Sequence, residues 1–297
     1  MLSLEDAYEA ALHGGVWVER PAACRLIRLT GPQRVWFLQN TITADVDDVP
    51  PGRWVESCFL DPKGRVQAHF RVGFGDEEIW LDVAPDAERL ALWFETYRFR
   101  TKVEIETHKR RSFTLLGPVA AATAADGEFR PEVTFGYELG DVPAADVHAD
   151  ALSEDWGPEG TPDLYEALRV EAGVGSYGVD FGERDLPQEA GLTRVVSVEK
   201  GCYVGQETVA RIHFRGHVNR TLRRLSFDGA EPGVGADLRL GEANVGRVTS
   251  VARSPRKGLV GLGMVRVEPP EGAQLEVDGG GTAGLGPLPQ GTKIKTG

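Results

Sequence analysis

The nine residues KGCYVGQET, at positions 200–208, pose the first question about this chain. A thiol, Cys202, stands between Gly201 and Gly205 and follows the cation Lys200. Glycine lets the backbone take up positive φ angles or approach a ligand closely, and a nearby cation stabilises a thiolate. Two interpretations are open: a displayed, reactive thiol, or a tight turn around a buried and inert cysteine.

The composition of the chain is that of an ordinary globular protein. It has 297 residues, of which 41% are hydrophobic and 26% charged, enough for two or three packed units. No apolar run approaches the roughly 20 residues that would cross a bilayer, and the N-terminus lacks the pattern of a secretory signal. The cysteines Cys24, Cys58 and Cys202 are too few and too far apart for a disulfide framework. We therefore expect a cytoplasmic protein with no membrane partner.

Charge is distributed unevenly along the chain. The net charge of −12 argues against a direct nucleic-acid partner, since such binding depends on neutralising phosphates. Between Arg194 and Arg224, however, seven Lys and Arg residues stand against two acidic ones. This segment is interpreted either as a binding surface for a small anion or as a solvated edge whose counter-charges come from elsewhere in the fold.

Patterns in the first two thirds of the chain favour an α+β fold. Two stretches of alternating hydrophobic residues flank the turn sequence Asp61-Pro62-Lys63-Gly64 and predict a β-hairpin. Thr30-Gly31-Pro32 and Thr161-Pro162-Asp163 each predict the start of a helix. The sequence GVGSYG (173–178) fits G-x-G-x-x-G, but a helix precedes it where a nucleotide loop needs a strand. Gly173 is therefore predicted to end that helix in a left-handed conformation.

The last third has a different character. Short apolar stretches separated by Gly and Pro predict a small β-barrel or sandwich. We predict that residues 1–216 form one α+β region of two intertwined subdomains, that residues 217–287 form the barrel, and that residues 288–297 are a disordered tail. Cys202, His213 and His217 fall short of the four ligands of a structural zinc site, and no metal site is expected.

KGCYVGQE resembles the signature loop of the YgfZ-type folate-binding proteins, relatives of the glycine-cleavage T-protein, an aminomethyltransferase. Five further stretches carry the resemblance, which extends over roughly residues 20–270: LIRLTGPQRVWFLQNTITADV (26–46), FLDPKGRV (59–66), LRVEAGVGSYGVDF (168–181), LPQEAGL (186–192) and GLVGLGMVR (258–266). The resemblance implies three subdomains around a central channel, the last a β-barrel, with tetrahydrofolate held in the channel and residues 1–216 forming the folate-binding region.

The resemblance also implies roles for individual residues. Glu171 is expected to accept the N–H groups of a pterin, and the Arg and Lys residues from Arg194 to Arg224 are expected to receive a glutamate tail of one or more units. Aromatic side chains suit the walls around a flat ring. The full set of predicted folate contacts is Glu171, Tyr203, Gln206, Arg211, Trp80 and Tyr97. Cys202 is expected to be a reactive thiolate activated by Lys200.

The function implied is that of a tetrahydrofolate-binding accessory protein that assists the assembly or repair of iron–sulfur enzymes, including those that modify tRNA. T-proteins carry acidic residues shortly after the hairpin glycine, whereas Gly64 is followed here by RVQAH. Without a carboxylate to assist proton movement, glycine-cleavage activity is not expected. The alternative is a folate-dependent one-carbon transferase or demethylase. The expected partners are folate and iron–sulfur client proteins, and the chain is expected to be a monomer.

Overall fold

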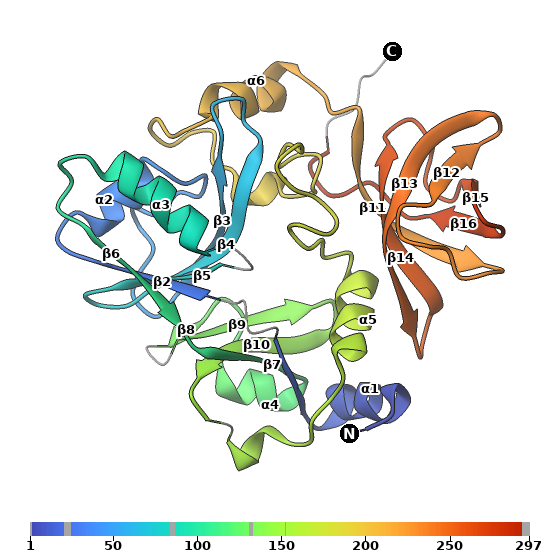
Figure 1. Ribbon diagram of the computed structural model, residues 1–297, viewed down its shortest axis with the longest axis horizontal. Coiled ribbons are helices and arrows are strands. Elements are labelled where there is room, and N and C mark those ends of the chain that lie inside the picture. Colours follow the sequence, from blue (N-terminus) through green and yellow to red (C-terminus); the bar gives the residue numbers. More distant parts are fainter. Residues whose placement is uncertain (1, 21–24, 84–86, 131–132, 152, 293–297) are drawn as a thin grey trace.

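The computed structural model describes residues 2–20, 25–83, 87–130, 133–151 and 153–292. Two five-stranded antiparallel sheets and a closed six-stranded barrel surround a central stretch of chain (Figure 1). This arrangement confirms the predicted α+β class, with three subdomains and a C-terminal β-barrel. No helix among the described residues is both long enough and apolar enough to span a membrane.

One sheet has the strand order β3-β4-β5-β2-β6. Helices α2 (Arg34–Gln39) and α3 (Ala87–Arg98) pack on it, and Phe37 meets Phe94 edge to face with 5.4 Å between ring centroids. The strands are β2 (Arg25–Thr30), β3 (Trp54–Leu60), β4 (Val66–Phe74), β5 (Ile79–Val83) and β6 (Glu104–Lys109).

The second sheet has the order β1-β7-β10-β9-β8, and α1 (Leu4–His13) and α4 (Pro118–Thr123) pack beside it. The chain leaves this sheet after β1, builds the whole of the first sheet and returns at β7, so the two sheets are intertwined. The strands are β1 (Val16–Glu19), β7 (Arg111–Leu116), β8 (Phe129–Arg130), β9 (Thr134–Leu139) and β10 (Val142–Ala149). A short 3-10 helix, η1 (Glu154–Trp156), follows β10.

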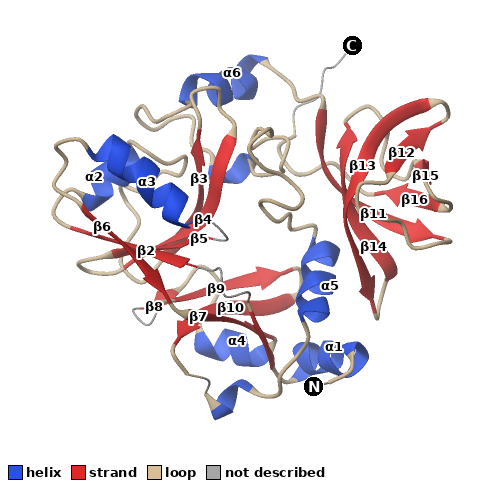
Figure 2. Ribbon diagram, in the orientation of Figure 1, coloured by secondary structure: helices blue, strands red, loops and turns tan. Residues whose placement is uncertain are grey.

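The barrel closes in the order β11-β14-β13-β12-β15-β16, which leaves no exposed sheet edge. Helix α5 (Pro162–Ala172) packs against β13 and β14 and so links the second sheet to the barrel. Figure 2 shows that the chain between α5 and α6 (Gln206–Arg215) is mostly loop, interrupted by the 3-10 helix η2 (Thr193–Val195). The barrel strands are β11 (Arg220–Asp228), β12 (Asp237–Leu240), β13 (Ala243–Ser254), β14 (Gly258–Arg266), β15 (Gln274–Val277) and β16 (Thr282–Leu285).

The structure contains the predicted hairpin and one of the two predicted helix starts. The β3–β4 hairpin is confirmed, and α5 begins at Pro162 and ends at Gly173, which has φ 77°. The helix predicted from Thr30 is wrong in its start, because Thr30 ends β2 and α2 begins at Arg34. Cys58 is fully buried in the core, whereas Cys24 lies outside the described residues.

The prediction of a disordered tail needs a partial correction. Residues 288–291 lie against the body of the protein and line a cavity, and Thr292 donates a backbone hydrogen bond to the carbonyl of Pro289. Residues 293–297 lie outside the described part of the chain.

Candidate functional site

Two adjoining cavities lie where the three units meet. The first, of about 440 Å³, lies between the two sheets and α5, and we call it the acidic cavity. The second, of about 540 Å³, lies between the first sheet, β11 and residues 287–291, and we call it the arginine cavity. Glu56, His69, Val174 and Gly175 line both. Each volume falls in the range of about 300–1,000 Å³ usual for small-molecule sites.

The acidic cavity combines apolar walls with an excess of carboxylates. Five acidic side chains and three arginines line it, and Arg111 and Arg194 pair with Glu19 and Glu56 from outside this lining. Phe70, Tyr165 and Tyr177 supply aromatic surface, which suits a flat ring. The charged lining residues are Glu19, Glu56, Asp82, Asp146 and Glu166 with Arg20, Arg71 and Arg169.

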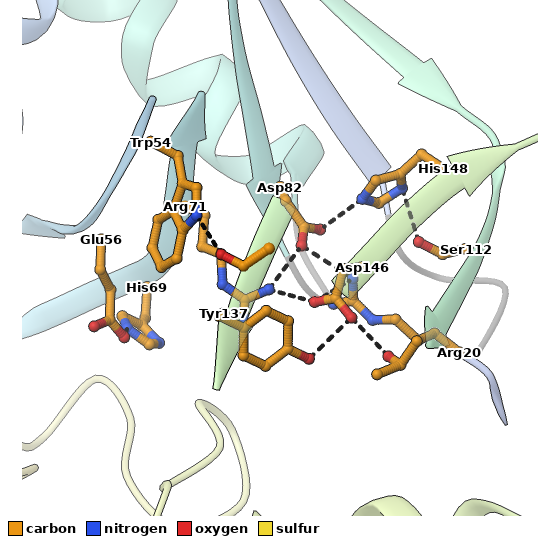
Figure 3. Close-up of polar contacts among 12 residues, drawn as sticks. Arg20, Trp54, Glu56, His69, Arg71, Asp82, Ser112, Tyr137, Asp146 and His148 are labelled. Atoms are coloured by element: carbon orange, nitrogen blue, oxygen red, sulfur yellow. Dashed lines mark hydrogen bonds and ion pairs between the residues drawn. The ribbon is translucent and has the colours of Figure 1, made fainter. Parts of the chain in front are cut away.

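A buried ion-pair network forms one wall of the acidic cavity (Figure 3). Arg20 Nη1 lies 3.0 Å from Asp82 Oδ2 and 3.3 Å from Asp146 Oδ2. Arg71 pairs with Asp146 and lies 3.6 Å from Asp82. Burial is the largest single influence and raises both carboxyl pKa values, but Arg20 and Arg71, joined by His148 at Asp82, together outweigh it and hold both pKa values below their usual range. Both aspartates are therefore ionised at neutral pH.

The same network joins the two sheets. Asp82 and Arg71 come from β5 and β4, whereas Asp146 comes from β10. Asp146 Oδ1 also accepts hydrogen bonds from Thr114 Oγ1 at 2.6 Å and from the Tyr137 hydroxyl at 3.0 Å, both in the second sheet. Buried charges need this degree of pairing to be tolerated. The cavity wall is thus held rigidly between the two sheets.

His148 extends the network away from the cavity. Its Nδ1 lies 2.7 Å from Ser112 Oγ, and its Nε2 lies 3.3 Å from Asp82 Oδ1 (Figure 3). The latter distance permits an ion pair when the imidazole is protonated, although the two atoms lack hydrogen-bond geometry. His148 is buried and lines neither cavity.

A histidine–carboxylate pair stands at the neck between the two cavities. Glu56 on β3 and His69 on β4 are diagonal neighbours of the antiparallel pair, and His69 Nε2 lies 2.7 Å from Glu56 Oε1. Arg194 pairs with the other carboxylate oxygen of Glu56. Burial raises the pKa of Glu56, but His69, Arg194 and Arg71 outweigh it and bring the pKa to about 2. Glu56 is therefore a fixed negative charge at the neck.

Three polar groups of the acidic cavity have hydrogen-bonding capacity to spare. His69 Nδ1, the Tyr165 hydroxyl and Ser176 Oγ make no hydrogen bond to any residue that the structure describes. A few convergent polar groups on an otherwise apolar wall are what fix the orientation of a small ligand.

The arginine cavity has the opposite charge balance. Arg194, Arg223 and Arg224 line it together with one acid, Glu56. Arg223 is buried, and its donors are taken by the carbonyls of Pro269, at 2.7 Å, and Gly286. Arg224 is exposed and makes only a long contact, 3.4 Å, with the carbonyl of Glu171. Arg224 is therefore the cation best placed to receive an anionic ligand.

Other bases of the segment from Arg194 to Arg224 do not act as one surface. Arg220 pairs with Asp185 at 2.8 Å and with Glu189 at 3.2 Å, so acids from elsewhere in the fold balance it. Arg211 is exposed on α6 and lines neither cavity. The expected anion site is thus reduced to the arginines of the arginine cavity.

Lys200 has a different role from the predicted one. Its ammonium group is buried and donates to the carbonyls of Ile42, at 2.7 Å, and Ala44, and burial lowers its pKa to about 8. The Lys200 side chain thus ties the loop to the segment after α2, and its donors are committed to backbone rather than to a thiol. Cys202 is exposed and lines neither cavity. Its reactivity stays a prediction, without the expected activation by Lys200.

The remaining residues of the signature loop shape the loop itself. Tyr203 donates its hydroxyl to the carbonyl of Ser197 at 2.7 Å, and Gln206 donates to the carbonyl of Lys200 at 2.9 Å. Gly205 has φ 80°, and a Cβ there would stand 2.4 Å from the Asp61 carbonyl oxygen in the β3–β4 turn. Neither Tyr203 nor Gln206 lines a cavity, so their predicted folate contacts stay predictions.

Three other predicted contacts, Glu171, Trp80 and Tyr97, line neither cavity. Glu171 accepts hydrogen bonds from the Tyr8 hydroxyl at 3.1 and 3.2 Å and lies 3.4 Å from Lys257 Nζ. Trp80 is buried in the core and donates to Glu78 at 2.7 Å, and Tyr97 packs at the surface against Phe59. The folate contacts predicted for Glu171, Trp80 and Tyr97 stay predictions. The walls of the acidic cavity carry other acidic and aromatic residues, among them Glu166, Tyr165, Tyr177 and Phe70.

Helix periodicity explains why Glu166 on α5 lines the acidic cavity whereas Glu171 does not. Residues 165, 166 and 169 share one face, since neighbours three and four apart lie side by side. Glu171 lies about 200° around the axis from Arg169 and points to the other side. The ion pair of Arg169 with Glu166, at 2.6 Å, marks the cavity face and was recognisable as an i, i+3 pair in the sequence.

A scan of protein-family models finds no match for this chain. Among curated proteins, the aminomethyltransferase of Bordetella petrii is 27% identical over 85% of this chain and 78% of its own length. The tRNA-modifying protein YgfZ of Yersinia enterocolitica is 27% identical over 73% of this chain and 74% of its own. The iron–sulfur cluster assembly factor IBA57 homolog of Pyricularia oryzae, a mitochondrial protein, is 28% identical over 81% of this chain and 68% of its own.

The fold has a counterpart among solved structures. The crystal structure of the glycine cleavage system aminomethyltransferase T from Bartonella henselae superposes with a TM-score of 0.85 and 21% identity, covering 99% of this chain and 91% of that chain. The chain therefore has the fold of an aminomethyltransferase, and it is similar at 27–28% identity to proteins named aminomethyltransferase, YgfZ and IBA57.

Proposed function

We propose that this protein binds a reduced folate across both cavities, with the pterin in the acidic cavity and the glutamate tail in the arginine cavity. The observation that carries the proposal is the pairing of two adjoining cavities with opposite charge balance. A reduced pterin is flat and rich in N–H donors, which suits aromatic walls and excess carboxylates. Its tail carries carboxylates, which suit Arg224. The ligand therefore has one favoured orientation.

The proposed role is that of a cytoplasmic accessory protein, active with iron–sulfur enzymes. It is supported by the similarity to proteins named as an iron–sulfur cluster assembly factor and as tRNA-modifying proteins. The clients include enzymes that modify tRNA, and Cys202, exposed on the loop before α6, is the thiol available to them. One cysteine cannot supply the four thiolates of a usual cluster, so any cluster contact is shared with the client.

A one-carbon transferase or demethylase that uses folate as cosubstrate is the second candidate. The pair of Glu56 and His69 favours it, because a histidine oriented by a carboxylate is suited to moving protons. Incubation with methylene-tetrahydrofolate separates the two: a transferase forms product over many turnovers, whereas an accessory protein shows affinity alone.

Calorimetric titration with mono- and pentaglutamyl tetrahydrofolate at two salt concentrations tests the proposal. We expect tighter binding of the pentaglutamate, weakened by salt, since contacts to exposed charges are screened. Arg224→Ala should reduce this preference. The matched control is Arg253→Ala, because Arg253 is an exposed barrel arginine that pairs with Glu231 and lines neither cavity. Equal loss in both variants, or no folate binding by the parent, contradicts the proposal.

A further inference from the structure

We infer that His69 selects the chemical state of the bound folate, by accepting a hydrogen bond from an N–H that a one-carbon unit would replace. The inference rests on the proposed function and concerns the neck between the cavities. His69 is the histidine that lines both cavities, and its ring packs edge-on against Phe181 with 5.7 Å between centroids. Any ligand that spans the two cavities passes this ring.

The tautomer of His69 follows from its partner. An ionised carboxylate only accepts hydrogen bonds, and Glu56 is held in that state between His69 and Arg194. The Nε2 atom of His69 must therefore carry the hydrogen that it donates to Glu56. In the neutral imidazole this leaves Nδ1 as an acceptor, and Nδ1 has no partner among the described residues.

The carboxylates at the neck already have partners. Each oxygen of Glu56 and of Glu166 accepts from His69, Arg194 or Arg169. His69 Nδ1 differs in having no partner in the described part of the chain. The other charged and titratable groups that line the two cavities are Glu19, Arg20, Arg71, Asp82, Asp146, Tyr165, Arg169, Tyr177, Arg194, Arg223 and Arg224.

The chemistry of the ligand allows this acceptor to discriminate between unsubstituted and substituted tetrahydrofolate. Tetrahydrofolate carries N–H groups at N5 and N10, where one-carbon units are attached. A methyl at N5 or a formyl at N10 replaces the hydrogen that Nδ1 would accept. Sites that hydrogen-bond a ligand N–H discriminate strongly against analogues that lack it, since a polar group is left unpaired. The unloaded carrier should therefore bind more tightly than the form substituted at the nitrogen facing His69.

Two substitutions of His69 distinguish the acceptor role of Nδ1 from the contact of Nε2 with Glu56. In His69→Gln the amide reaches the place of Nε2 and retains a donor for Glu56, but no acceptor stands at the place of Nδ1. In His69→Asn the amide oxygen takes the place of Nδ1, but the shorter side chain places no donor where Nε2 stood. The affinities of the parent and both variants are measured by calorimetry for tetrahydrofolate, 5-methyltetrahydrofolate and 10-formyltetrahydrofolate at pH 7.5. Thermal unfolding verifies that each variant is folded.

We expect the parent to prefer tetrahydrofolate over one substituted form by about 10-fold or more. His69→Gln should bind all three within about 3-fold, whereas His69→Asn should retain a preference. Equal affinities in the parent, or a preference unchanged in His69→Gln, overturn the inference while leaving the proposed function intact. Failure of the parent to bind any of the three overturns both.

Discussion

Replacing Glu56 by Gln removes the negative charge that pairs with His69 and Arg194 at the neck. The lowered pKa of Glu56 gives the size of the expected loss of stability. The pKa of Glu56 is about 2 in the folded protein against 4.5 for the free side chain. At about 1.4 kcal/mol for each pKa unit, the difference corresponds to about 3 kcal/mol of stability. Because the folded pKa is the lower one, this contribution is complete above pH 4.5 and disappears as the pH falls toward 2.

The assay is urea unfolding of the parent and Glu56→Gln at pH 7 and pH 3.5. The variant should be less stable by about 3 kcal/mol at pH 7 and by about 2 kcal/mol at pH 3.5. Glu231→Gln is the matched control, because its pair with Arg253 is exposed and should contribute under about 1 kcal/mol. A loss below about 1 kcal/mol at pH 7, or a loss that grows on acidification, would refute the reasoning about the neck.

Three further predictions concern the buried ion-pair network around Asp146, the signature loop at Gly205 and the thiol of Cys202. Asp146→Ala should cost about 3–5 kcal/mol in urea unfolding, since it leaves two buried arginines, Arg20 and Arg71, to share the single carboxylate of Asp82. Asp237→Ala, in an exposed pair with Arg239, should cost under about 1 kcal/mol, and equal costs would contradict the account. Gly205→Ala should lower the unfolding temperature clearly while Gly201→Ala should not, because only the first would place a Cβ against the hairpin turn. Peptide mapping after brief iodoacetamide treatment should find Cys202 alkylated and Cys58 intact, since Cys58 is buried and burial raises its thiol pKa; equal labelling of the two in the folded protein would be the opposite result.

Much of the fold could be predicted because its signals are local. The turn at Asp61–Gly64, the proline at the start of α5 and the glycine at its end all have the conformations that their residue types favour. The second sheet was harder to predict, because β10 has Asp146 and His148 buried within it. Polar residues at inward positions disturb the alternation from which a strand is recognised.

The site depended on contacts between distant segments. Glu56 meets His69 across a hairpin and Arg194 from 138 residues away. The sequence shows no carboxylate directly after the hairpin glycine, yet the neighbouring strand brings one to His69. Lys200 stands beside Cys202 in the chain, but burial turns its ammonium group toward the carbonyls of Ile42 and Ala44. Neighbourhood in sequence was therefore a poor guide to neighbourhood in space at this loop.

The central claim is that one ligand occupies both cavities in a fixed orientation. The most direct measurement is a crystal structure of the protein with tetrahydrofolate diglutamate. The account predicts the pterin between His69 and Tyr165 in the acidic cavity and the glutamate carboxylates beside Arg224. A pterin bound at Glu171 or in the arginine cavity, with the tail directed toward the Asp82 and Asp146 wall, would contradict it.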